Sequence, residues 1–175
     1  MAKIGLFYGS STGNTETAAF QLKEELDSFD GWETEITNIG ASDKDKVASY
    51  QYLVLGIPTW NTGELQDDWD VFFPQLREID FKSKKVAVFG MGDQNGYGFN
   101  FLDAIGMLAD EVLLQGGELV GMWPTNKYEF EDSKAAIEDH FMGLGLDHEG
   151  QSEMTAPRVK EWAKQVIEEF EGKYD

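Results

Sequence analysis

The sequence predicts a doubly wound α/β protein, in which a parallel β-sheet carries helices on both faces. Short apolar runs alternate along the chain with segments of helical spacing, and crossovers of this kind join parallel strands. The chain has 175 residues, of which 41% are apolar and 13% aromatic, enough to fill the core of one domain. We therefore expect a single domain over residues 1–175.

Five apolar runs have the length and pattern of strands, which predicts a five-stranded sheet. They are Lys3–Tyr8, Trp32–Asn38, Tyr52–Ile57, Lys85–Gly90 and Glu118–Met122. Apolar residues at helical spacing predict helices over Thr15–Phe29, Phe101–Leu113 and Thr155–Phe170. The second should end at the pair Gly116–Gly117, and Thr155 should be the N-cap of the third.

A segment from about residue 123 to 149, rich in Gly, Asp, Glu and aromatic residues, interrupts the alternation. We interpret it as a long insertion near the last predicted strand. Both histidines of the chain, His140 and His148, belong to it, and we expect them at the surface. Its aromatic residues should pack the insertion onto the domain rather than form a second site.

The composition excludes several kinds of chemistry. The chain has no Cys, which removes disulfides, thiolate metal sites, iron–sulfur clusters and cysteine nucleophiles. Two histidines are too few for a His-rich metal site. We therefore expect a bound organic cofactor to supply any redox or group-transfer chemistry.

The chain is strongly acidic, with a net charge of −19. This charge repels nucleic acid and anionic membranes and favours partners with basic surfaces. An acidic coat that serves only solubility, or adaptation to salt, is the alternative interpretation.

The first residues enter a strand pattern directly, and no run approaches the roughly 20 apolar residues of a membrane span. We expect a cytoplasmic protein without membrane insertion.

In a doubly wound sheet, ligands bind at the carboxyl ends of the strands, and three unusual loops leave such ends. The first, Gly9–Thr15, combines four hydroxyl side chains with the start of a helix. Free backbone N–H groups and the helix dipole make such a loop a site for an anion. It lacks the Lys of a Walker A loop, so it suits a phosphate monoester held by hydrogen bonds. An ordinary Ser/Thr-rich cap is the alternative.

The second loop, Pro58–Gly63, places Trp60 directly after a buried strand, and the third, Gly92–Tyr97, offers an aromatic ring and the Asp93 carboxylate. Each loop alone could be an ordinary turn or loop anchor. Together, an anion loop and two aromatic loops at one sheet edge predict a site for a flat ring system with one phosphate. FMN has this chemistry.

The three motifs, in this order and spacing, resemble those of the flavodoxin family over essentially the whole chain. The insertion is similar to the loop that splits the final strand in long-chain flavodoxins. The resemblance implies a flavodoxin-like fold and FMN as cofactor. It implies that the phosphate is held by Ser10, Ser11, Thr12, Gly13, Asn14 and Thr15. The flavin ring would lie among Pro58, Thr59, Trp60, Asn61, Thr62, Gly63, Gly92, Asp93 and Tyr97, with Trp60 and Tyr97 on its faces. Asn100 and Asp147 would lie near the cofactor.

The resemblance also implies a function. Flavodoxins are low-potential one-electron carriers that use the semiquinone/hydroquinone couple of FMN, not enzymes. In the family a peptide flip accompanies reduction, and the matching bond here is Asn61–Thr62. Because Thr62 is β-branched, Thr62→Gly is expected to favour the flipped form. The implied partners are basic-surfaced redox proteins such as a ferredoxin–NADP reductase or a photosystem acceptor side. The protein itself is expected to be a monomer.

Two positions depart from the family pattern. Gly98 and Phe99 stand where many long-chain members have Ala and Asp, which loosens the backbone beside Tyr97 and exchanges a charge for a ring. Asn14 is uncharged where some relatives carry Lys.

Two other functions fit parts of the sequence. A flavin enzyme such as a quinone reductase shares this kind of fold, but it would need a substrate pocket and usually a second subunit. A receiver-type signalling domain shares the order of elements. It would need an acidic cluster after the first strand, where this chain has Tyr8-Gly9-Ser10.

Overall fold

The computed structural model describes residues 2–9, 13–60 and 63–173, with the side chains of Trp60 and Glu64 left out. Its centre is a parallel sheet in the order β11-β6-β3-β1-β2, with β7 also paired to β6. The strands are β1 (Ala2–Tyr8), β2 (Trp32–Asn38), β3 (Tyr52–Gly56), β6 (Lys85–Met91), β7 (Glu118–Val120) and β11 (Leu144–Leu146). The alternation of strand and helix predicted this doubly wound parallel sheet, and the structure adds the order of its strands.

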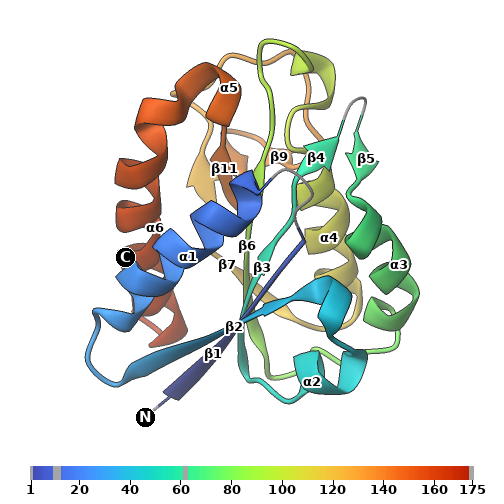
Figure 1. Cartoon of the computed structure of the whole chain (residues 1–175), viewed down its shortest axis with the longest axis vertical. Helices are drawn as coiled ribbons and strands as arrows, with labels where there is room; N and C mark the ends of the chain where they lie inside the picture. Colours follow the sequence, from blue (N-terminus) through green and yellow to red (C-terminus); the bar gives the residue numbers. More distant parts are fainter. Residues whose placement is uncertain (1, 10–12, 61–62, 174–175) are drawn as a thin grey trace.

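Helices cover both faces of the sheet (Figure 1). They are α1 (Asn14–Asp27), α2 (Lys44–Ala48), α3 (Asp67–Leu76), α4 (Asp103–Leu114), α5 (His148–Gln151) and α6 (Thr155–Phe170). Side chains of α1 and α6 pack on one face with Leu6, Val54 and Phe89, while α3 and α4 pack on the other with Phe7 and Leu55. Successive residues of a buried strand therefore point into two separate cores, which explains why the strands are apolar throughout.

The fifth strand position is split, as predicted, because two short strands pair with β6 at different points. β7 pairs with Lys85–Ala87 at the start of β6, whereas β11 pairs with Phe89–Met91 at its end. The chain between Val120 and Leu144 therefore forms the insertion, and the expected range of 123–149 ends too late. Strand β11 was not recognised in the sequence, because Gly143 and Gly145 interrupt its apolar pattern.

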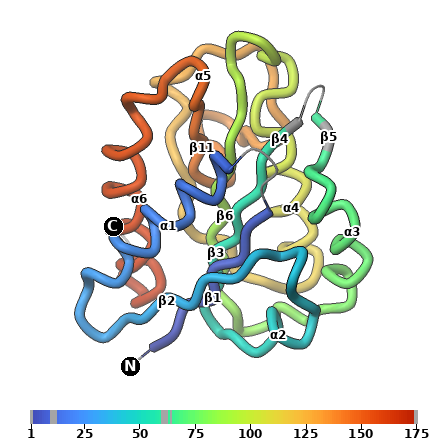
Figure 2. The backbone as a smooth tube through the Cα atoms, viewed as in Figure 1, coloured from blue at the N-terminus to red at the C-terminus, as the bar shows by residue number. Residues whose placement is uncertain are grey.

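The insertion contains a small antiparallel sheet of β8 (Trp123–Pro124), β10 (His140–Phe141) and β9 (Ala136–Ile137). Figure 2 shows the insertion beside the loop that follows β6. A two-stranded hairpin, β4 (Thr59–Trp60) and β5 (Glu64–Leu65), follows β3. Both additions lie at the carboxyl edge of the main sheet.

Helix α6 begins differently from the prediction. A short 3-10 helix (Ser152–Met154) leads directly into it, Met154 occupies the N-cap position, and Thr155 is the first helical residue. The Thr155 hydroxyl is buried without a hydrogen-bond partner, so it does not cap the helix. Helix α3 was not predicted, because its apolar residues are interrupted by Pro74.

Candidate cofactor site

A cavity of about 480 Å³ opens at the carboxyl edge of the sheet. Its walls come from the start of α1, the loop after β3, the loop after β6 and the start of α5. The lining residues are Asn14, Thr15, Pro58, Thr59, Met91, Gly92, Asp93, Tyr97, His148 and Glu149. The structure therefore brings residues of all three predicted loops together around one hollow.

The first wall is the amino-terminal turn of α1. Gly13 precedes the helix with φ 90°, in the left-handed region that glycine tolerates. The Thr15 side chain lies beside the cavity and is 1% exposed. The first N–H groups of a helix have no acceptor within the helix, and such a turn is suited to an anion. Ser10, Ser11 and Thr12, which were also predicted to hold a phosphate, lie outside the described residues.

Tyr8 ends β1 just before this loop. Its hydroxyl donates to a Glu16 carboxylate oxygen at 2.7 Å. Burial, and then this hydrogen bond to Glu16, raise the pKa of Tyr8 to about 12. The phenol is therefore neutral at physiological pH and adds no charge beside the predicted phosphate loop.

The second wall is the start of the β4–β5 hairpin. Pro58 is buried, and the Thr59 hydroxyl accepts a hydrogen bond from the Ala104 N–H of α4 at 2.9 Å. Gly63 has φ 91°, the conformation expected for this turn. Asn61 and Thr62 lie outside the described residues, as does the side chain of Trp60. The structure thus anchors the hairpin but does not place its predicted aromatic ring.

The third wall is the loop after β6. Asp93 accepts hydrogen bonds from the N–H groups of Asn95 and Gly96 at 3.1 and 2.8 Å, so its carboxylate shapes the turn as well as lining the cavity. Tyr97 is 43% exposed and belongs to the cavity wall. A flat ligand between these walls would cover the exposed face of this ring.

Asn100 and Asp147 do not line the cavity. Asn100 donates to the buried Asp103 carboxylate at 3.1 Å. Asp147 is 0% exposed and accepts hydrogen bonds from Gln94 and Gly150, beneath the loop after β6. Both residues hold loops of the site instead of facing its hollow.

The structure explains one departure from the family pattern. Gly98 is buried, and its carbonyl accepts hydrogen bonds from the N–H groups of Glu131 and Asp132 in the insertion, at 2.9 and 3.1 Å. A Cβ at this position would meet the Glu131 side chain. Phe99 turns outward and is 71% exposed, so this position offers an apolar surface beside the site.

Four residues of this region were not among the predicted site residues: Met91, Gln94, His148 and Glu149. Met91 ends β6, and His148 and Glu149 follow β11, so all three stand at carboxyl ends of strands. Recognition of β11 would have identified the last two by the same rule as the other loops. His148 is exposed, as expected, but it also lines the cavity.

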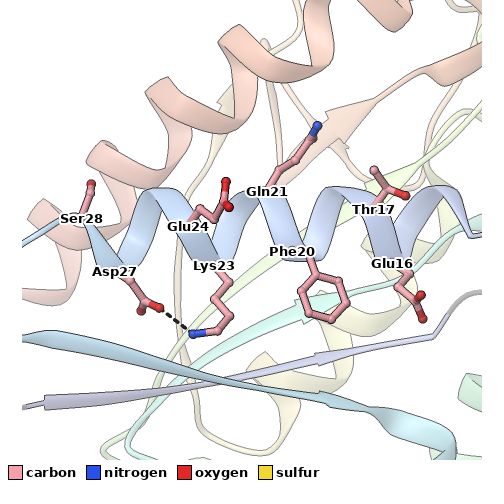
Figure 3. Close-up of a pocket in the computed structure, with 8 residues that line it drawn as sticks. All are labelled: Glu16, Thr17, Phe20, Gln21, Lys23, Glu24, Asp27 and Ser28. Atoms are coloured by element: carbon pink, nitrogen blue, oxygen red, sulfur yellow. Dashed lines mark hydrogen bonds and ion pairs between the residues drawn. The ribbon is translucent and has the colours of Figure 1, made fainter.

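A second hollow, of about 770 Å³, lies against the outer surface of α1. Figure 3 shows that its side chains leave opposite sides of the helix, with Thr17 and Gln21 on one side and Glu16 and Phe20 on the other. All its residues come from α1 and its C-cap. Because no second element converges on this hollow, we do not consider it a cofactor site.

No helix in the described ranges is long and apolar enough to cross a membrane. The same residues hold no group of three or more His, Asp or Glu side chains placed to bind a metal ion.

The fold and the cavity together define a doubly wound protein in which a helix amino terminus and a tyrosine ring line one hollow at the sheet edge. The family model for flavodoxin matches residues 6–162. A flavodoxin of Synechocystis sp. is 49% identical over 168 residues, covering 95% of this chain and 96% of the relative. Flavodoxin 1 of Escherichia coli is 48% identical over 171 residues, covering 97% and 96%.

Solved structures agree with these relatives. The crystal structure of Fusobacterium nucleatum flavodoxin bound to flavin mononucleotide has a TM-score of 0.90 and 30% identity, covering 97% of this chain and 99% of that one. The chain belongs to the flavodoxin family, whose members are electron-transfer flavoproteins.

Proposed function

We propose that this chain binds one FMN without a covalent bond and works as a low-potential one-electron carrier between larger redox proteins. The observation that carries the proposal is the cavity. It joins the amino-terminal turn of α1, with Asn14 and Thr15, to a wall that contains Tyr97, in a chain of the flavodoxin family.

The residues present fit FMN. The cavity of about 480 Å³ falls within the range of cofactor sites. Its α1 end offers N–H groups and the Thr15 side chain to a phosphate, and its opposite walls offer Pro58, Met91 and Tyr97 to a flat ring. When bound, FMN supplies the one-electron chemistry. The protein's residues bind it, orient it and keep water from its faces.

We assign the cofactor contacts as follows. Thr15 and Asn14, with the predicted Ser10, Ser11, Thr12 and Gly13, hold the phosphate. Tyr97 stacks on the ring, and Trp60 is proposed for its other face. Asp93 and Gly92 lie at the edge of the ring. Asn100 and Asp147 support the site indirectly, through hydrogen bonds to Asp103 and Gln94 respectively.

The charge around the cavity supports a low potential for the second reduction step. Asp93 and Glu149 line the hollow, Asp147 is buried close behind it, and His148 is the one described lining residue that can carry a positive charge. A unit charge at ~10 Å costs about 0.4 kcal/mol in water and more where the dielectric is lower. A second electron added to this site therefore meets repulsion, so the fully reduced protein should be a strong donor.

Charge also supports the choice of partner. Lysines stand at the end of the molecule opposite the cavity: Lys3 is the second residue of β1, Lys85 starts β6, and Lys44 starts α2. The cavity end carries Asp67 and Asp68 at the start of α3 and Glu149 in α5. A partner with a basic surface, such as a ferredoxin–NADP reductase or a photosystem acceptor side, would meet the cavity end first. We propose this role for a monomer in the cytoplasm.

Titration of the apoprotein with FMN, riboflavin and FAD tests the function, with stepwise reduction of the complex followed by absorbance. We expect tight 1:1 binding of FMN, weaker binding of riboflavin, and two separate one-electron steps. Failure to bind FMN would contradict the proposal and revive a non-flavin role such as a signalling domain. Turnover of a quinone with a nicotinamide donor and no added reductase would instead indicate a flavin enzyme.

A further inference from the structure

Gln94 is a buried amide at the meeting point of three segments. It belongs to the loop after β6 and is 6% exposed. Its Nε2 donates to Asp147 Oδ2 at 2.8 Å, and its backbone N–H donates to the same oxygen at 3.1 Å. Its Oε1 accepts from the Glu129 N–H of the insertion at 2.6 Å. One side chain therefore joins the cavity loop, the end of β11 and the insertion.

We propose that Gln94 is a positioning residue that couples the insertion to the flavin-binding loop, so that the insertion sets flavin affinity without touching the flavin. This inference rests on the proposed FMN site. Gln94 does not line the cavity, but Asp93 and Tyr97 of the same loop do. Their placement depends on where Gln94 holds the backbone between them.

The Asp147 carboxylate gives this coupling its strength. Asp147 is fully buried, and its other oxygen accepts the Gly150 N–H at 2.8 Å. Three N–H donors thus surround a buried anion, and hydrogen bonds to a charged group are stronger than neutral ones. Removal of the Gln94 amide leaves both the buried Asp147 oxygen and the Glu129 N–H short of a partner, which is costly inside a protein.

The insertion is anchored independently on its other side. Arg158 of α6 is 3% exposed, and its guanidinium lies 4.1 Å from the centre of the Tyr128 ring. It also donates to Gln151 Oε1 at 2.8 Å and to the Lys127 carbonyl at 3.3 Å. The segment that donates to Gln94 is therefore held against α6. The loop after β6 is therefore hydrogen-bonded to a segment of the insertion that is itself held against α6.

The first test compares Gln94→Ala with Gln165→Ala. Gln165 of α6 is a matched control, because its amide also donates to the insertion, to the Met122 carbonyl at 2.8 Å, outside the contacts that involve Gln94 and Arg158. Gln94→Ala should weaken FMN and riboflavin binding alike, by about tenfold each. Gln165→Ala should lower thermal stability and leave both affinities unchanged.

The equal loss for both ligands locates the effect at the ring, because a disturbed phosphate loop would affect FMN alone. Gln94→Ala should also change the visible circular dichroism of the bound flavin and make its lower one-electron potential less negative, since water reaches the ring. A merely structural role for Gln94 would move the melting temperature but neither of these readouts.

A charge swap keeps the proposal testable if Gln94→Ala folds poorly. Gln94→Glu places two carboxylates in contact and should weaken both flavins. In the double variant with Asp147→Asn, the carboxylate introduced at position 94 can accept from the amide introduced at position 147 and from the Glu129 N–H. The double variant should therefore bind flavin more tightly than Gln94→Glu alone. If the two substitutions acted independently, their losses of affinity would add and the double variant would bind more weakly.

Two results would overturn the inference while the FMN function stands. One is unchanged flavin affinity in Gln94→Ala, and the other is additive losses in the swap. If the wild-type apoprotein itself fails to bind FMN, the proposed function fails instead.

Discussion

At the residue scale, the site depends on side chains whose neighbours decide what they can do. Thr15 and Thr17 share the first turns of α1, but Thr15 is buried beside the cavity, whereas Thr17 is exposed and donates to the Gly13 carbonyl at 2.9 Å. Tyr97 and Phe99 share one loop, but only Tyr97 lines the cavity. Each pair offers a site residue and a matched control.

We expect Thr15→Ala to weaken FMN binding by about 10- to 100-fold and riboflavin binding little, because a hydrogen bond to a charged phosphate is worth about 1.5–3 kcal/mol. Thr17→Ala should leave both affinities as they are. Fluorescence titration of the two apoproteins with FMN and with riboflavin measures the four dissociation constants. Equal losses for FMN and riboflavin in Thr15→Ala would show that this residue does not serve the phosphate.

We expect Tyr97→Ala to weaken FMN and riboflavin alike, by about tenfold, because aromatic stacking adds about 0.5–1.5 kcal/mol beyond the area buried. The lower one-electron potential should shift as well. Phe99→Ala, in the same loop but outside the cavity, should leave both affinity and potential unchanged. If Tyr97→Ala behaved like Phe99→Ala, the ring would not lie on the flavin.

At the scale of elements, buried hydrogen bonds join the insertion to the sheet. The Tyr128 hydroxyl donates to the Gly145 carbonyl of β11 at 2.6 Å and accepts from Trp123 Nε1 at 3.0 Å. Burial raises the pKa of Tyr128 to about 12. The folded protein therefore favours the neutral phenol that these bonds require.

Tyr128→Phe should lower the free energy of unfolding at neutral pH by about 1–3 kcal/mol, because it leaves buried partners unpaired. Because the pKa of Tyr128 is raised in the folded protein, the neutral phenol contributes fully to the free energy of unfolding below pH 10.0, the ordinary pKa of tyrosine. This contribution is lost as the pH rises through about 12. Urea unfolding of both proteins should thus give stabilities that converge above pH 10. A difference that stays constant over this range would contradict the assignment.

At the scale of the whole molecule, the net charge is −19, and the cavity end carries acidic residues such as Asp67 and Asp68 at the start of α3 and Glu149 in α5. Such an arrangement orients a basic partner during encounter, and salt screens it over about 10 Å at 0.1 M. The alternative is that the charge serves solubility, and that docking depends on apolar contact at Phe99.

Electron transfer to a basic-surfaced reductase should slow at least about tenfold from low to physiological ionic strength in stopped-flow measurements. Glu153→Gln, at the cavity end, should reduce the rate at low salt more than Glu33→Gln, near the opposite end; both side chains are exposed. A rate that is flat with salt, combined with a loss in Phe99→Ala, would favour apolar docking.

Local patterns in the sequence were sufficient to predict five strands of the main sheet, the three longest helices and the three loops, because periodicity and turn chemistry are local properties. They also predicted that residues 9–15, 58–63 and 92–97 meet, since carboxyl ends of parallel strands share one edge. They did not reveal β11, because glycines broke the apolar pattern, and His148 and Glu149 were therefore missed as lining residues.

Which polar residues face the cavity and which support it was settled by tertiary contacts. Asp93 and Asp147 are both carboxylates that follow strands, but one lines the hollow and the other is buried under Gln94. Side-chain direction at a loop depends on contacts with segments far away in the sequence, here the insertion and α5. No local pattern encodes such contacts, and for that reason the role of Gln94 became visible only in the folded molecule.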